Sequence, residues 1–120
     1  MSGRGRVACS RDELTLGALS LDQPEEGPRV NADTILLASY VRDTFSGARG
    51  GRDALDLGCA TGAVALILAR RFPGLTSIKG LDIQGELVRL ANENARRNGL
   101  QDRVSFVEGD LRRIREVFPP

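Results

Sequence analysis

Short segments with β character alternate with longer helical segments along most of the chain. Residues 54–57, 76–81 and 104–107 are brief runs that end at glycine or acidic residues, a pattern typical of buried strands. The segment that begins at Thr61 is apolar on all sides, which predicts a buried helix. The segment 86–97 is amphipathic and predicts a helix with these residues facing inward: Leu87, Val88, Leu90, Ala91 and Ala95.

The order strand, helix, strand, helix, strand defines the expected fold class. It is typical of α/β proteins with a parallel, doubly wound, Rossmann-like sheet, whose right-handed connections place helices on both faces. Residues 111–117 are expected to form a short helical turn after the third strand. With 120 residues, the chain is long enough for one domain and too short for two.

The pattern is weaker near the N-terminus. Residues 1–12 are expected to form a flexible tail, and the domain is expected to span residues 13–120. Leucines that alternate on either side of Gly17 and Ala18 predict a small β-hairpin. Residues 23–29 contain two prolines and a glycine and are therefore expected to form a loop.

A further helix should follow this loop. Asn31 and Asp33 are both suitable N-caps, and the sequence leaves the choice between them open. The glycines of residues 46–51 are expected to end the helix. Its apolar positions recur at helical spacing: Ile35, Leu37, Ala38, Val41 and Phe45.

Composition and charge exclude several kinds of chemistry. Lys and Arg total 17 and Asp and Glu total 16, so the formal net charge is +1 and gives no electrostatic argument for nucleic-acid or membrane binding. The absence of histidine excludes an imidazole base and histidine-ligated metals. Cys9 and Cys59 form no CxxC pair, so no metal site is expected. No signal peptide or spanning segment is apparent, and we expect a cytoplasmic protein without membrane contact.

The candidate chemistry lies where the strands end. The run Asp56-Leu57-Gly58-Cys59-Ala60-Thr61-Gly62 connects the first of these strands to its helix, and Asp82 and Asp110 follow the next two. The carboxyl ends of parallel strands meet at one edge of the sheet, where ligands of such folds bind. This run is neither the dinucleotide G-x-G-x-x-G motif nor a P-loop, and Asp56 would repel a pyrophosphate. A ligand with an ammonium group, a sulfonium centre and a carboxylate, such as S-adenosylmethionine, fits this edge better.

Here the sequence resembles a known family. The pattern Asp56-x-Gly58-x-Ala60-x-Gly62 is similar to motif I of the class I S-adenosylmethionine-dependent methyltransferases. The resemblance implies that Asp82 holds the ribose hydroxyls and that Ile83 packs on the adenine. It also implies that Asp110 accepts a hydrogen bond from the adenine amino group and that Leu111 offers its backbone N–H. The alternative roles are helix N-caps for Asp82 and Asp110, and a small filler for Cys59.

The segment 23–38 narrows the resemblance. It is similar to the region before motif I in the "methyltransferase small" group, above all in bacterial tRNA (adenine-N6) methyltransferases that act on valine tRNA. Methyltransferases for rRNA guanine N2 and for release-factor glutamine have similar segments. Asp33 matches the family's acidic residue and is therefore a candidate cofactor contact, with a plain N-cap as the alternative. Arg29 could face either the substrate or solvent.

The family's acceptor motif is absent. These enzymes carry Asn or Asp followed by Pro-Pro-Tyr, whereas Phe118-Pro119-Pro120 lacks the amide or acid, the aromatic residue and the preceding strand. The chain is therefore interpreted as the cofactor-binding half of a methyltransferase, truncated after the third core strand and without a catalytic residue. The implied whole enzyme would methylate an amino nitrogen of a nucleic acid base, with tRNA adenine N6 favoured, and would hold the RNA through its missing half.

Other functions stay open at this point. The acceptor could be a protein glutamine, an rRNA guanine or a small molecule. The chain could instead be a non-catalytic cofactor-binding or interaction module, whereas a dehydrogenase is disfavoured by the glycine spacing. Alone, the chain is expected to lack transfer activity and to associate through the open edge of its third strand, which a fourth strand should cover.

Overall fold

A parallel sheet forms the centre of the molecule. The computed structural model describes residues 8–14, 19–27, 29–41 and 52–120. Strands β3 (Asp53–Leu57), β4 (Ser77–Asp82) and β5 (Val104–Glu108) pair in that order and are all parallel. The three strands predicted from the sequence, and with them the α/β fold class, are confirmed.

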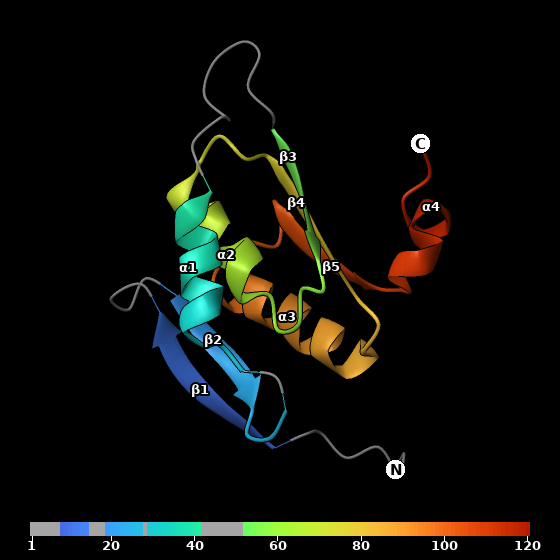
Figure 1. The fold of residues 1–120 in the computed structure, drawn as a ribbon. Coiled ribbons are helices and arrows are strands. Elements are labelled where there is room, and N and C mark those ends of the chain that lie inside the picture. Colours follow the sequence, from blue (N-terminus) through green and yellow to red (C-terminus); the bar gives the residue numbers. More distant parts are fainter. Residues whose placement is uncertain (1–7, 15–18, 28, 42–51) are drawn as a thin grey trace.

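The long helices cover one face of this sheet. Figure 1 shows α1 (Ala32–Tyr40), α2 (Ala63–Arg71) and α3 (Gly85–Arg97) on one side of the strands. The short helices η1 (Leu111–Arg113) and α4 (Ile114–Val117) lie on the other side. The strands reflect this asymmetry, because Ile78 and Phe106 are buried whereas Lys79 and Val107 are exposed. None of the helices in the described ranges is both long and apolar enough to cross a membrane.

The predictions for the helices of the core are confirmed. Helix α2 is buried nearly all round, and the inward residues expected for α3 are buried. Helix α3 ends in a Schellman motif, in which Gly99 has φ +69° and its N–H donates to the Arg96 carbonyl, while the Leu100 N–H donates to the Ala95 carbonyl. These bonds satisfy carbonyls at the end of the helix.

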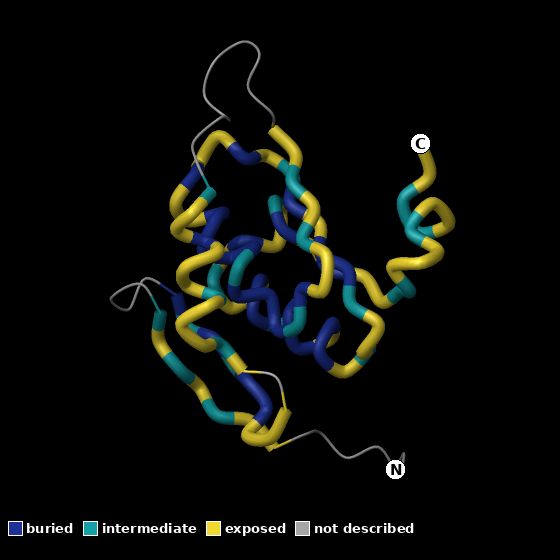
Figure 2. The backbone as a smooth tube through the Cα atoms, viewed as in Figure 1, coloured by how far each residue is buried: buried dark blue, intermediate teal, exposed yellow. Residues whose placement is uncertain are grey.

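The N-terminal segment forms a hairpin, as expected, but it begins earlier than expected. Strands β1 (Cys9–Leu14) and β2 (Leu19–Pro24) are antiparallel. Residues 9–12 therefore belong to β1 and not to a tail, and residues 23–24 belong to β2 and not to a loop. The predicted turn at Gly17 lies outside the described residues. Figure 2 shows that β2 is largely buried against the rest of the molecule, whereas β1 is on its outer side.

The N-cap of α1 is Asn31 and not Asp33. The Asn31 side chain accepts a hydrogen bond from the Thr34 N–H (3.1 Å), and the Thr34 hydroxyl accepts one from the Asn31 N–H (3.4 Å). This capping box satisfies two backbone donors at once. Asp33 is left in the first turn of the helix. The glycines that were expected to end this helix lie outside the described residues.

The outer edge of β5 is covered by α3 over part of its length, whereas the sequence led us to expect an open edge along the third strand. Helix α3 lies beside this edge, and the Asn92 amide accepts from the Phe106 N–H (3.0 Å) and donates to the Phe106 carbonyl (2.9 Å). The Val104 N–H donates to the Leu100 carbonyl. At the opposite edge of this sheet, β3 has no partner strand on its second side among the described residues.

Candidate functional site

The site is a groove along the carboxyl edge of the sheet, formed by two pockets that meet at Gly58. The first pocket has a volume of about 330 Å³ and is lined by the glycine-rich loop together with residues before and within α1, among them Arg29, Asp33 and Leu37. The second has a volume of about 250 Å³ and is lined by Gly58 and by the ends of β4 and β5: Leu81, Asp82, Ile83, Gly109, Asp110 and Leu111. Gly58 is the residue that both pockets share.

The backbone of the loop is held to the end of β4. The N–H groups of Gly58 and Cys59 both donate to the Leu81 carbonyl, at 2.8 and 3.0 Å. Gly58 has φ +74°, and a Cβ added there would have no atom within 4 Å. Ala60 also has positive φ, +47°. The open side of Gly58 therefore leaves the backbone accessible to a ligand, as the sequence predicted for this position.

Gly62 has a different role from the one expected. It is buried and is absent from the residues that line either pocket. Its φ is +90°, and a Cβ there would lie 2.7 Å from the Phe106 ring. The glycine is required by this backbone conformation and by the packing of Phe106.

Asp56 brings a buried carboxylate to the first pocket. Its Oδ2 is buried and has no hydrogen-bond partner. Burial, with a further contribution from the charge of Asp82, raises the pKa of Asp56 to about 6, although a hydrogen bond from the Ala65 N–H opposes the shift. A positive group entering this pocket would supply the missing partner.

Asp82 supports the loop and also faces the second pocket. Its Oδ2 accepts from the Ala60 N–H and its Oδ1 from the Gln84 N–H, both at 2.9 Å. A carboxylate oxygen can accept more than one hydrogen bond, so both oxygens of Asp82 can also accept hydrogen bonds from ligand hydroxyls. The N-cap of α3 is Gln84 and not Asp82, although Asp82 accepts a hydrogen bond from a backbone donor at the start of the helix.

Asp110 is both a cap and a pocket residue. Its Oδ1 accepts from the Arg112 N–H (2.9 Å) at the start of η1, and its Oδ2 pairs with the Arg112 guanidinium (2.6 Å). These hydrogen bonds from Arg112 lower the pKa of Asp110 to about 2. The N-cap role is therefore present, and a ligand amino group would have to share this carboxylate with Arg112.

Two apolar side chains of the second pocket are unusually accessible. Ile83 is 63% exposed and Leu111 is 53% exposed. Adjacent exposed apolar residues in a groove with a few polar groups are typical of a ligand site. They could flank a flat aromatic group, as the resemblance implies for the adenine.

The remaining candidates, Cys59 included, line the first pocket. Asp33 and Arg29 both line the first pocket, where the Arg29 guanidinium donates to Asp12 (2.9 Å) and to the Pro24 carbonyl. Burial, with the nearby carboxylates, raises the pKa of the Cys59 thiol to about 12, so this residue is not a nucleophile. Sequence reasoning did not assign several further lining residues to the site, among them Val30, Thr34 and Leu37, although these three lie in the segment that carried the family resemblance.

Comparison with known proteins identifies the class. Residues 54–119 match the family described as methyltransferase domain, and the chain belongs to the class I S-adenosylmethionine-dependent methyltransferases. A tRNA1(Val) (adenine(37)-N6)-methyltransferase from Actinobacillus pleuropneumoniae is 37% identical over 69% of this chain and 33% of the relative. A release factor glutamine methyltransferase from Rhodospirillum rubrum is 39% identical over 83% of this chain and 28% of the relative.

A solved structure agrees with this assignment. A Klebsiella pneumoniae protein, named provisionally as an O-methyltransferase, has a TM-score of 0.59 and 25% identity, and the match covers 77% of this chain and 40% of that one. The chain spans about a third of the length of the curated relatives it matches.

The cofactor implied by the family is S-adenosylmethionine. The residues present fit this molecule, because the unpartnered Asp56 oxygen suits its positive groups and the open side of Gly58 would be filled by any Cβ.

Proposed function

We propose that the protein transfers a methyl group from S-adenosylmethionine to an amino nitrogen of a nucleic acid base, and that adenine N6 of a tRNA is the favoured acceptor. In this proposal the chain supplies the cofactor-binding half of the catalytic domain, and the RNA is held by a further part of the protein. The setting would be the cytoplasm. The observation that carries the proposal is the groove in which three strand ends and the glycine-rich loop bring Asp56, Asp82 and Asp110 to one edge.

The chain's own contribution to the reaction would be positioning. S-adenosylmethionine supplies the methyl group when bound. Asp56 would attract the ammonium group in the first pocket, Asp82 would accept the ribose hydroxyls, and Asp110 with Leu111 would hold the adenine. Holding the amino acid end of the cofactor in the first pocket and its adenine end in the second would restrict the direction in which the methyl group is presented, which is the kind of effect that orientation contributes to catalysis.

A protein glutamine is the second candidate acceptor. It is supported by the similarity to the Rhodospirillum rubrum release factor enzyme, which extends over more of this chain than the similarity to the Actinobacillus tRNA enzyme. Both acceptors present a planar amino nitrogen, so the groove described here would serve either. A non-catalytic cofactor-binding module is the alternative of another class.

Calorimetry tests the cofactor half of the proposal. The wild type should bind S-adenosylmethionine, and Asp82→Ala should weaken binding by about 1.5–3 kcal/mol, the range for a hydrogen bond to a charged group. Asp102→Ala, an exposed acid in the turn before β5, is the matched control and should leave the affinity unchanged. Equal affinities for the two variants would remove Asp82 from the site.

A methyl-transfer assay tests the acceptor. The full-length protein would be incubated with radiolabelled S-adenosylmethionine and either bulk tRNA or a release factor. Label in N6-methyladenine of tRNA supports the proposal, whereas label in release-factor glutamine replaces it with the second candidate. Cofactor binding without transfer to any substrate would support the binding module.

A further inference from the structure

Asn94 is a fully buried polar residue on α3 that lies outside the groove. Its side chain connects two segments that are distant in sequence. The Asn94 amide nitrogen donates to the Thr61 carbonyl of the glycine-rich loop (3.1 Å) and to the Asp22 carbonyl of β2 (3.0 Å). The Asn94 amide oxygen accepts from the Asp22 N–H (2.8 Å). A single amide group therefore binds both the hairpin and the cofactor loop.

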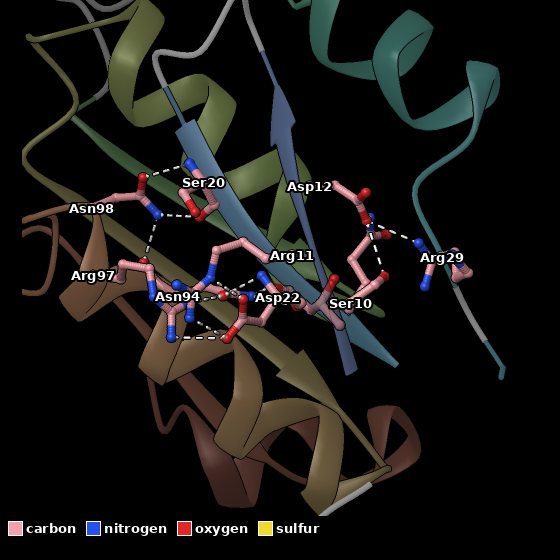
Figure 3. A network of polar contacts seen from close by, with 11 residues as sticks. Ser10, Arg11, Asp12, Ser20, Asp22, Arg29, Asn94, Arg97 and Asn98 are labelled. Carbon is pink, nitrogen blue, oxygen red and sulfur yellow. Dashed lines mark hydrogen bonds and ion pairs between the residues drawn. The ribbon is translucent and has the colours of Figure 1, made fainter. Parts of the chain in front are cut away.

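Asn98, one helical turn further along α3, provides a comparison. Its amide oxygen accepts from the Ser20 N–H (2.9 Å) and its amide nitrogen donates to the Ser20 carbonyl (2.7 Å), as Figure 3 shows. Both asparagines thus pair with the edge of β2 as a neighbouring strand would. Asn98, however, donates its other amide hydrogen to the Asn94 carbonyl of its own helix and not to the loop. The two residues differ in the bond to Thr61, and Asn94 also accepts a hydrogen bond from Arg97.

The position of the Asn94 side chain is fixed by charged neighbours. The Arg97 guanidinium donates to the Asn94 amide oxygen (3.0 Å) and pairs with the Asp22 carboxylate (2.8 Å). Arg11 of β1 pairs with the same carboxylate (2.8 Å). Figure 3 shows these groups gathered between β2 and α3. The hairpin is therefore attached to α3 at the point where Asn94 reaches the loop.

The hairpin is also attached to other residues that line the first pocket. The buried Gln23 side chain accepts from the Val30 N–H (2.6 Å) and donates to Asp12 (2.8 Å). Asp12 also binds Arg29 (2.9 Å). Val30 and Arg29 line the first pocket, as does Thr61. The hairpin is therefore bonded directly to Val30 and Arg29, and through Asn94 to Thr61, without lining the pocket itself.

We propose that Asn94 is a positioning residue that couples the docking of the hairpin to the conformation of the cofactor-binding loop. The loop contains Ala60 and Gly62 at positive φ, so its backbone depends on surrounding bonds to hold this conformation. Loss of the Asn94 donor would leave the buried Thr61 carbonyl without this partner. A buried acceptor that lacks a hydrogen bond destabilises the conformation that buries it. The proposal rests on the proposed function for its effect on the cofactor, but the coupling itself is a property of the ligand-free protein.

Hydrogen exchange tests the coupling without cofactor. Asn94→Ala and Asn98→Ala each remove two bonds to β2, but only Asn94→Ala removes the bond to Thr61. We expect both variants to speed exchange of the hairpin amides, and only Asn94→Ala to speed exchange of the amides of residues 58–62, by about tenfold. Equal loop exchange in the two variants would overturn the proposal.

Cofactor affinity provides the second readout. The dissociation constant of S-adenosylmethionine should rise about tenfold in Asn94→Ala and less than about twofold in Asn98→Ala. If the wild type binds no S-adenosylmethionine, the proposed function fails, whereas the exchange experiment still decides the coupling. Similar affinity losses in both variants would show that Asn94 has only a structural role.

A conservative variant keeps the test decisive if Asn94→Ala does not fold. Asn94→Asp keeps an acceptor for the Asp22 N–H but places a carboxylate against the Thr61 carbonyl. Protonation of that carboxyl at low pH restores a donor, so loop exchange in Asn94→Asp should approach that of the wild type at the same pH as the pH falls. If the loop amides of Asn94→Asp exchange faster than those of the wild type by the same factor at every pH, the role of the Asn94 donor is contradicted.

Discussion

Asp56 is the residue whose protonation is most sensitive to what occupies the groove. Its pKa of about 6 is raised chiefly by burial, and the charge of Asp82 adds to this. In the ligand-free protein the carboxyl therefore binds a proton more tightly than in the unfolded chain, and folding stability decreases as pH rises from about 4 through about 6. A cationic ligand beside Asp56 would favour its ionised carboxylate and would therefore lower the pKa of Asp56.

This linkage predicts a pH-dependent affinity for S-adenosylmethionine. If the cofactor's positive groups lie near Asp56, binding expels a proton below about pH 6, so the affinity should be full at pH 7 and fall by up to about tenfold per pH unit below 6. Calorimetry from pH 5 to 8 measures this slope. Asn at this position cannot titrate, so Asp56→Asn should bind more weakly at pH 7 and show a flatter profile. A wild-type affinity that does not change across this range would exclude the contact.

Gly58 gives the sharpest steric prediction. A Val side chain at Gly58 would be strained at φ +74° and would project into the open space between the two pockets. Gly58→Val should therefore abolish cofactor binding, whereas Gly27→Val, which has φ +99° and open space but lies away from the groove, should not. Circular dichroism would confirm that both variants fold. A folded Gly58→Val protein that binds S-adenosylmethionine normally would show that the loop is only a connection.

Residue roles could be predicted from sequence where the signal is local. Asp56, Gly58 and Asp82 lie at or just after the carboxyl ends of strands at a recognisable spacing, and the structure brings them to one groove. The role of Gly62 could not be predicted, because it depends on Phe106, which reaches it only in the folded sheet. Asn94 gave no sequence signal at all, because its partners come from two distant segments.

At the level of elements, arginine side chains bind the carbonyls at two helix ends. Arg103 lies before β5 and donates to the carbonyls of Ala69 and Phe72 at the end of α2, and to that of Leu75 beyond it, each at 2.9 Å. Arg71 donates to the carbonyls of Ala38, Ser39 and Val41 at the end of α1. The last carbonyls of a helix have no N–H donor in a following turn, so these hydrogen bonds help to satisfy them, and the positive charge also suits the helix dipole.

Loss of the Arg103 contacts should destabilise the fold. Arg103→Ala should reduce the free energy of unfolding by about 1.5–3 kcal/mol, since it removes charged hydrogen bonds to three carbonyls. Arg103→Lys keeps the charge but not the forked geometry and should recover only part of this loss. Urea unfolding followed by circular dichroism measures both variants. A fully stable Arg103→Ala protein would show that water replaces these bonds without cost.

The sequence predicted the central elements better than the first strand. The strands and helices of residues 53–108 contain enough apolar residues for their periodicity to be read. Strand β1 consists mostly of polar residues and was assigned to a tail, because its order comes from pairing with β2 and not from burial of its own side chains. The cap of α1 stayed ambiguous for a similar reason, because Asn31 and Asp33 have the same chemistry and only the backbone decides between them.

At the scale of the whole molecule, one side of the sheet is incompletely covered. Strand β3 has no partner on its outer side among the described residues, and Leu55 and Leu57 are 44% and 48% exposed. Val107 lies exposed on β5. In the described part of the chain this face is met only by the short helices η1 and α4 (Figure 1). An open strand edge beside exposed leucines favours pairing with another polypeptide.

We therefore predict that the 120-residue chain associates when it is produced alone, through β3 and not through β5. Light scattering should detect a species larger than a monomer, and Leu57→Lys should shift it toward the monomer because a charge at this edge opposes pairing. Glu13→Lys, an exposed position on the hairpin, is the control and should have no effect.

The same arrangement predicts that this chain alone transfers no methyl group to tRNA, since the acceptor motif of the family is absent from it. Cofactor binding should persist, because both pockets are built entirely from its own residues. A radiolabelled transfer assay on bulk tRNA, run beside calorimetry on the same sample, separates the two properties. A stable monomer that methylates RNA with these residues alone would contradict both the open edge and the assignment of acceptor binding to another part of the protein.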